Sequence, residues 1–99
     1  METIKVLLIE DEKIPREQLA KVIRKEGFEV LTAENGRVGL DVFKKELPEI
    51  VVTDVKMPDV DGLEVMHTVR RFSKNIQIIL ITAFGETDTV VAALREWAL

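Results

Sequence analysis

Acidic side chains stand directly after two apolar runs of this chain. The run Ile4–Ile9 ends in Glu10 and Asp11, and the run that begins at Val51 ends at Asp54. Apolar runs of four to eight residues are typical of strands that are buried on both faces of a parallel sheet. Ligands of such sheets bind at the edge formed by the carboxyl ends of the strands. The acidic residues therefore occupy positions where a binding or reaction site is expected.

The chemistry of these acids depends on whether their two strands are neighbours. If the strands pair, Glu10, Asp11 and Asp54 converge, and two carboxylates about 4 Å apart repel by on the order of 4 kcal/mol near a protein surface. Such a cluster requires a hard divalent cation or a raised pKa. Oxygen ligands with room for water fit Mg²⁺, which also binds phosphate oxygens, so the cluster favours phosphoryl transfer. Thr82 ends a further apolar run, where its hydroxyl can donate to a phosphoryl oxygen.

The elements that must position these residues alternate regularly between two kinds of segment. Strands are expected over 4–9, 28–33, 50–53 and 76–82, and helices from about Pro15 to Lys25, from Asn35-Gly36 to before Pro48, from Asp61 to Asn75 and from Thr87. The expected inner faces of the helices are Leu19, Val22 and Ile23; Val38, Val42 and Phe43; Leu63, Met66 and Val69; and Val90, Val91, Leu94 and Trp97. This alternation predicts four β/α units, a parallel sheet and helices on both of its faces.

Length, charge and composition narrow the possible functions. The chain has 99 residues, a net charge of −4 and no cysteine, which predicts one domain without disulfides. An acidic domain is not expected to bind nucleic acid directly, because phosphate backbones select basic surfaces. The sequence shows neither a secretion signal nor an apolar run of about 18 to 20 residues. A cytoplasmic location without membrane contact is expected.

Three motifs together resemble the receiver domain of two-component response regulators. They are Ile9-Glu10-Asp11-Glu12, the run Asp54–Gly62 with its pattern Asp-x-Lys-Met-Pro-x-x-Asp-Gly, and Thr82-Ala83. Their order, spacing and positions at strand ends all match, and the likeness extends from residue 1 to about residue 94. The resemblance implies a flavodoxin-like α/β fold with strand order 2-1-3-4 and a partner sensor histidine kinase.

The resemblance also implies a role for each matching residue. Asp54 would accept a phosphoryl group from a phosphohistidine, and Thr82 would contact that group and move with it. Asp11 would ligate Mg²⁺ directly, together with Asp54 and the backbone carbonyl of Lys56. Glu10 stands where the family usually has aspartate and would act through a metal-bound water. Such a domain catalyses only its own phosphorylation and dephosphorylation, so it is not expected to be an enzyme acting on other substrates.

The chain departs from the family after its last helix. A full receiver continues into a fifth strand that ends in Lys-Pro and then a fifth helix, whereas residues 95–99 do not resemble that continuation. The expectation is a receiver domain over residues 1–99 that is incomplete at its carboxyl end. The segment from Ala83 to Val91 is similar to receivers of sigma-54-type transcription activators, which suggests such an output domain if the chain is a fragment.

Two other hypotheses compete with a working phosphoacceptor. The run Ile76–Ile81 is apolar enough for a central strand, yet no further strand is expected beside it, and an exposed apolar edge invites pairing with another chain. The chain would then be a receiver impaired in phosphorylation that self-associates as an interaction module. The third hypothesis is a small binding protein for a phosphate-bearing ligand such as a flavin, which the lack of a phosphate-binding loop rich in Ser, Thr or Gly argues against.

Overall fold

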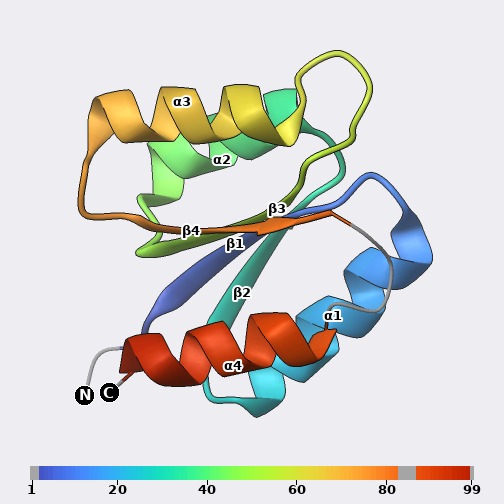
Figure 1. The fold of residues 1–99 in the computed structure, drawn as a ribbon, viewed down its shortest axis with the longest axis vertical. Coiled ribbons are helices and arrows are strands. Elements are labelled where there is room, and N and C mark those ends of the chain that lie inside the picture. The colour runs from blue at the N-terminus through green and yellow to red at the C-terminus, as the bar shows by residue number, and fades with distance from the viewer. Residues whose placement is uncertain (1–2, 83–86, 99) are drawn as a thin grey trace.

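The computed structural model describes residues 3–82 and 87–98. Its elements in chain order are β1 (Lys5–Ile9), α1 (Lys13–Lys25), β2 (Glu29–Ala33), α2 (Gly36–Glu46), β3 (Ile50–Asp54), α3 (Gly62–Phe72), β4 (Gln77–Ile81) and α4 (Thr87–Ala98). The four strands form one sheet in the order β2-β1-β3-β4, and every pairing is parallel (Figure 1). These features confirm the predicted α/β, flavodoxin-like architecture with strand order 2-1-3-4.

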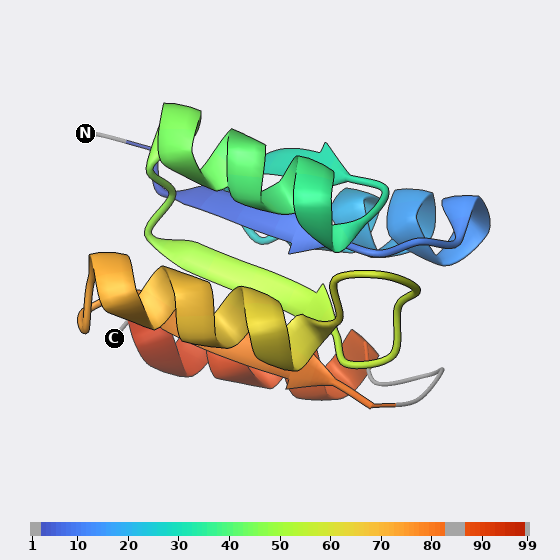
Figure 2. The ribbon, with the colours of Figure 1, turned by 90° about the horizontal axis from the view of Figure 1, so that it is seen from above.

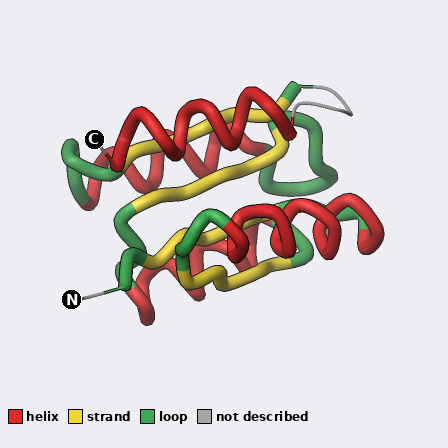
Figure 3. Tube along the Cα trace, turned by 90° about the horizontal axis from the view of Figure 1, so that it is seen from below, coloured by secondary structure: helices red, strands yellow, loops and turns green. Residues whose placement is uncertain are grey.

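Two helices cover each face of the sheet. Helices α2 and α3 lie over one face, and α1 and α4 lie over the other, as Figures 1 and 2 show from two directions and the tube of Figure 3 shows from below. The α2–α3 layer encloses a cluster of Leu7, Ile9, Ala33, Phe43, Val51, Met57, Val65 and Val69. The α1–α4 layer encloses Val6, Leu8, Ala20, Ile23, Phe28, Val30, Ile50, Val52, Ile79, Val90 and Leu94. Alternate residues of β1 and β3 thus serve opposite clusters, as the period of a strand requires.

The helix ends follow the signals in the sequence with one exception. The side chains of Asn35 and Asp61 cap α2 and α3 by accepting from the backbone N–H groups of Val38 and Glu64. Gly27 follows α1 with a φ of +98°, a left-handed conformation that favours glycine. The exception is α3, which was expected to reach Asn75 but ends at Phe72, because Ser73 has extended backbone angles.

Two residues predicted on inner helix faces are largely exposed. Val38 is 39% exposed and Leu63 is 44% exposed, while Val65 of α3 is fully buried. Both exposed residues lie in the first turn of their helices. Apolar spacing placed Val69 of α3 correctly, but it placed Leu63 inward where the structure buries Val65. Trp97 and the expected loop at 83–85 fall on side chains or residues outside the described part of the chain.

Strand β4 lies at the end of the sheet order. Within the described residues it pairs only with β3, through contacts such as the N–H of Gln77 with the carbonyl of Glu49. Neighbouring residues of a strand direct their backbone groups to opposite sides, so those of Ile78 and Leu80 point away from β3. Both side chains are only half-buried. Among the described residues, the strongly apolar β4 is thus at the edge of the sheet.

Candidate functional site

Three acidic side chains meet at the carboxyl edge of the sheet. Strands β1 and β3 are neighbours, with Ile9 opposite Thr53, so Glu10 and Asp54 lie at the same end of adjacent strands. One carboxylate oxygen each from Glu10, Asp11 and Asp54 lies within 4.8 Å of the other two. The convergence predicted from the two apolar runs is therefore present.

The three acids differ in their environment. Glu10 is buried, Asp54 is half-buried and Asp11 is exposed. The backbone of Glu10 is held from two sides, because its N–H donates to the carbonyl of Ala33 at 3.1 Å and its carbonyl accepts from Nη1 of Arg16 at 2.9 Å. Arg16 belongs to α1, so both the neighbouring strand and the first helix fix this corner of the site.

Burial and neighbouring charge make Glu10 the most perturbed acid of the site. The pKa of Glu10 is raised to about 8. The largest cause is removal from water, followed by contact with Asp54, to which a protonated Glu10 can donate, and by the negative charges of Asp54, Asp11 and Glu12. In the described part of the chain, Oε2 of Glu10 is the one buried side-chain oxygen or nitrogen without a hydrogen-bond partner. The Glu10 carboxyl group is therefore suited either to keep a proton or to lie beside a cation.

The loop between β3 and α3 is tied closely to Asp54. The N–H of Lys56 donates to Oδ1 of Asp54 at 3.0 Å, and the N–H of Gly62 donates to the carbonyl of Val55 at 3.0 Å. A Cβ at Gly62 would lie 2.2 Å from the carbonyl oxygen of Asp54, so α3 begins in direct contact with the end of β3. A shallow hollow of about 480 Å³ opens beside the loop, lined by Val55, Lys56, Met57, Pro58 and Asp61.

Thr82 lies at the same edge of the sheet. Asp54 is opposite Ile81 in the pairing of β3 with β4, and the exposed Thr82 follows directly. The carboxyl ends of three adjacent strands thus carry Glu10 with Asp11, Asp54 and Thr82. Every residue named from the sequence as a candidate for this site lies at or beside this edge, and Lys56 borders it through the loop.

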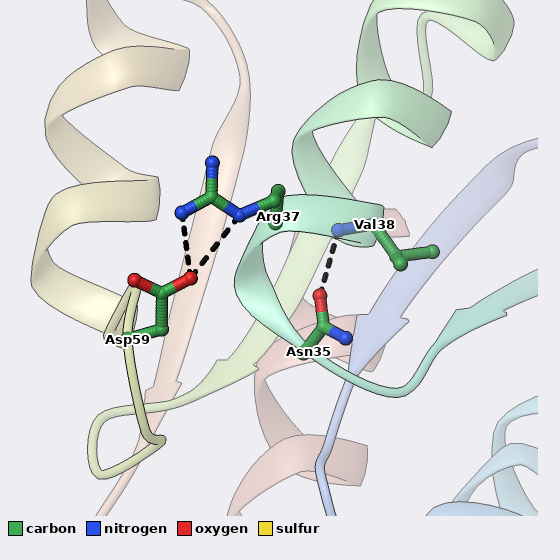
Figure 4. A network of polar contacts seen from close by, with 4 residues as sticks. All are labelled: Asn35, Arg37, Val38 and Asp59. Atoms are coloured by element: carbon green, nitrogen blue, oxygen red, sulfur yellow. Dashed lines mark hydrogen bonds and ion pairs between the residues drawn. The ribbon is translucent and has the colours of Figure 1, made fainter.

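Sequence reasoning missed two arginines that brace the site from the helices. Arg16 contacts the carbonyl of Glu10, and Arg37 of α2 donates through Nε and Nη2 to Oδ2 of Asp59 in the loop after β3, at 3.1 and 2.6 Å (Figure 4). Asp59 itself has a left-handed φ of 69°. No local pattern pairs residues 22 positions apart, so the ion pair emerges only from the fold.

The residues present at this edge fit a magnesium ion. The donors are all oxygens, and Mg²⁺ binds through one or two carboxylates while keeping several waters. A cation beside Glu10 would also satisfy its unpartnered buried oxygen. The described residues contain no other group of three His, Cys, Asp or Glu side chains close enough to share a metal ion.

Comparison with known proteins confirms the resemblance to receiver domains. The model of the response regulator receiver domain family matches residues 6–98. Sporulation initiation phosphotransferase F of Bacillus subtilis is 37% identical over 95 residues, which are 96% of this chain and 77% of that protein. By contrast, this chain spans only 20% of the regulatory protein AtoC of Escherichia coli, at 35% identity.

Solved structures agree with the sequence comparisons. A crystal structure of the histidine kinase ThkA in complex with the response regulator protein TrrA contains a chain with 37% identity and a TM-score of 0.76, covering 84% of this chain and 72% of that one. The chemotaxis protein CheY4 of Vibrio cholerae shares the fold, with a TM-score of 0.84 at 24% identity over 96% of this chain and 98% of that one. No helix in the described ranges has the length and apolar character needed to cross a lipid bilayer. The chain belongs to the family of response regulator receiver domains, the signalling modules of two-component systems.

Proposed function

We propose that this chain takes a phosphoryl group on Asp54 in a Mg²⁺-dependent reaction and thereby changes its signalling state. The observation that carries the proposal is the convergence of Glu10, Asp11 and Asp54, with their oxygens within 4.8 Å of one another. In addition, Asp54 is half-buried at a strand end, where a donor can approach it.

The reaction needs one nucleophile and a fixed geometry. An oxygen of Asp54 attacks the phosphorus of a phosphohistidine, the new O–P bond forms, and the P–N bond breaks with its electron pair left on the imidazole. The N–H of Lys56 orients the carboxylate by binding Oδ1 of Asp54. The hydroxyl of Thr82 donates to an oxygen of the transferred group.

The chain would hold magnesium through Asp11, Asp54 and the carbonyl of Lys56, with Glu10 acting through a bound water. When bound there, the ion neutralises negative charge on the moving phosphoryl group. Three converging acids otherwise repel an anionic donor, so the reaction should depend on the cation.

Intact-mass measurement tests the proposal directly. The protein is incubated with phosphoramidate in the presence of Mg²⁺ or of a chelator, and a mass increase of one phosphoryl group is expected only with Mg²⁺. The variant Asp54→Ala should gain no phosphoryl group, whereas Glu29→Gln, which changes an exposed acid at the amino end of β2, opposite the acidic edge, should behave as wild type. An adduct that persists in Asp54→Ala, or none in wild type, would contradict the proposal.

The proposed partners follow from the family. A sensor histidine kinase would supply the phosphoryl group, as the solved complex of ThkA with TrrA suggests for a related pair. The short coverage of AtoC is consistent with an output domain in longer relatives, and such a domain would read the state of Asp54. Phosphotransfer from a purified kinase to wild type but not to Asp54→Ala tests the first of these partners.

A second candidate function is self-association through β4. The observation that favours it is the outer edge of this strand, where the backbone groups of Ile78 and Leu80 face away from β3. The apolar side chains of the same two residues are only half-buried. Sedimentation at several concentrations should show a dimer that Leu80→Lys disrupts, since a charge on an edge strand opposes pairing. A monomer at every concentration would remove this candidate.

A further inference from the structure

The loop that follows Asp54 is held at its far side by the first turn of α2. Arg37 donates two hydrogen bonds to Oδ2 of Asp59 (Figure 4). Asp59 has a left-handed backbone conformation, which is uncommon outside glycine and is held by the surrounding structure. The pair joins α2 to a loop that is otherwise anchored at its base by the hydrogen bond from Gly62 to Val55.

A second contact presses the same two segments together. A Cβ at Gly36 would lie 2.3 Å from the carbonyl oxygen of Val60, so the first residue of α2 touches the loop backbone next to Asp59. Asn35 caps this helix by accepting from Val38, which fixes the position of Gly36 and Arg37 (Figure 4). The arginine therefore extends from a rigid helix start rather than from a flexible segment.

The part of the loop that faces the acidic site lies between Val55, which is held by Gly62, and Asp59, which is held by Arg37. Lys56 is three residues before Asp59, and its N–H binds the Asp54 carboxylate. Displacement of the loop at Asp59 would change the orientation of both Lys56 backbone groups, including the carbonyl proposed as a magnesium ligand. Small displacements of positioning groups reduce reaction rates even when the fold is kept.

The charges around Arg37 support this role. The hydrogen bonds and charge of Asp59 raise the pKa of Arg37, with smaller contributions from Asp41 and Glu64. Arg37 thus faces three acids, and Asp59 is the one that it binds directly. We propose that Arg37 is a positioning residue for phosphorylation, which holds the loop after β3 through Asp59 and so aligns Lys56 with Asp54; this inference rests on the function proposed above.

The variants follow from the geometry. Arg37→Met removes the ion pair and keeps an unbranched, flexible side chain in place of the apolar stem of arginine. Asp59→Asn removes the negative charge and keeps a residue that tolerates the left-handed conformation, so backbone strain is not introduced. Arg95→Met is the matched control, because Arg95 is also 69% exposed and also contacts one carboxylate, Glu26, but lies on the opposite layer.

Two measurements are made on each variant. The first is the rate of Asp54 phosphorylation by phosphoramidate over a range of Mg²⁺ concentrations. Arg37→Met and Asp59→Asn should each lower the rate about two- to fivefold, as expected for loss of an exposed ion pair, and raise the Mg²⁺ concentration for half-maximal rate. The double variant should be no slower than either single one, since both remove the same interaction. Arg95→Met should match wild type in both quantities.

The second measurement is amide hydrogen exchange of residues 55–61 without any phosphodonor. Exchange should be faster in Arg37→Met and Asp59→Asn and unchanged in Arg95→Met. Wild-type rates and exchange in Arg37→Met, or equal losses in Arg95→Met, would overturn the inference. If wild type takes no phosphoryl group, the proposed function fails, while hydrogen exchange still decides whether Arg37 holds the loop.

Discussion

The two helix layers of this domain contact the sheet in different ways. In the α2–α3 layer, three glycines pack so closely against other residues that an added Cβ would lie 2.2 to 2.4 Å from Val60, Ile9 or Asp54. Helices α1 and α4 contain no glycine and rest on apolar side chains such as Ile23, Val90 and Leu94. Where a helix backbone touches its neighbour directly, a shift of the helix moves that neighbour, whereas apolar packing mainly supplies stability. We therefore expect changes at these glycine contacts of the first layer to affect the site. Changes in the apolar packing of the second layer, away from Arg16 of α1, should affect stability alone.

The largest effect is expected from Gly62→Ala. The new Cβ would lie 2.2 Å from the carbonyl oxygen of Asp54 and 2.8 Å from Cα of Val55, and backbone atoms cannot move aside as a flexible side chain can. We expect a loss of about 3 kcal/mol or more in the free energy of unfolding, together with a more than tenfold loss in the rate of Asp54 phosphorylation. Urea denaturation and intact mass measure the two quantities.

The control for this substitution is Gly27→Ala on the other side of the sheet. A Cβ there has no atom within 4 Å, so only the left-handed φ of +98° penalises alanine, by about 1 kcal/mol. Phosphorylation should be unchanged. Similar losses of activity in both variants would contradict the distinction between the layers.

Leu94→Ala tests the apolar layer itself. Leu94 is fully buried in the cluster between α4 and the sheet. Its truncation should cost about 2 to 3 kcal/mol, because the cavity left by a buried leucine side chain is only partly filled by its surroundings. The folded protein should still phosphorylate Asp54 at the wild-type rate, measured well below the unfolding transition.

The exposed residue Glu96 of the same helix provides the control for Leu94. Glu96→Ala should leave both stability and phosphorylation near wild type. A strong loss of phosphorylation in folded Leu94→Ala would show that the α1–α4 layer also controls the site.

Much of the sheet and of the acidic edge could be predicted from the sequence. Carboxyl ends of adjacent parallel strands meet at one edge, so the apolar runs ending at Glu10 and at Asp54 predicted the acidic cluster on the condition that their strands are neighbours. The alternation of segments predicted the parallel sheet, and the family resemblance supplied the order of its strands. The roles of these acids in metal binding and phosphoryl transfer stay predictions until they are measured.

Other features depend on contacts that no local pattern encodes. Helical spacing shows which stripe of a helix is apolar, but not how far along that stripe the neighbouring segments cover it. Val38 and Leu63 were therefore placed inward by mistake. The pairing of Arg37 with Asp59 joins two exposed charges from separate elements. Similarly, the position of α4 beside α1 requires the packed core, because an amphipathic stripe fits either face of a sheet.

A smaller effect is expected from the pH dependence of metal-free protein. The pKa of Glu10 is raised to about 8 in the folded state from about 4.5, so the folded form binds the extra proton. The stability that this group contributes is fully present below pH 4.5 and is lost as the pH rises to about 8. The slope from this group is at most about 1.4 kcal/mol per pH unit. In chelator, urea denaturation of Glu10→Gln should show a flatter profile over this window than wild type. Equal slopes would mean that Glu10 does not carry the proton.

The smallest effect is expected from Glu26→Gln in the α1–α4 layer. Hydrogen bonds from Arg95 to both oxygens of Glu26 lower the pKa of this carboxyl, so any stabilisation is present above its usual pKa and is lost as the pH falls through the lowered value. Exposed ion pairs contribute little and are screened by salt. The urea midpoint of Glu26→Gln should therefore fall slightly at pH 7 in low salt and match wild type in high salt, with phosphorylation unaffected throughout. A change in the Mg²⁺ dependence of Asp54 phosphorylation would contradict the separation of the two layers, because this ion pair contacts no part of the acidic edge.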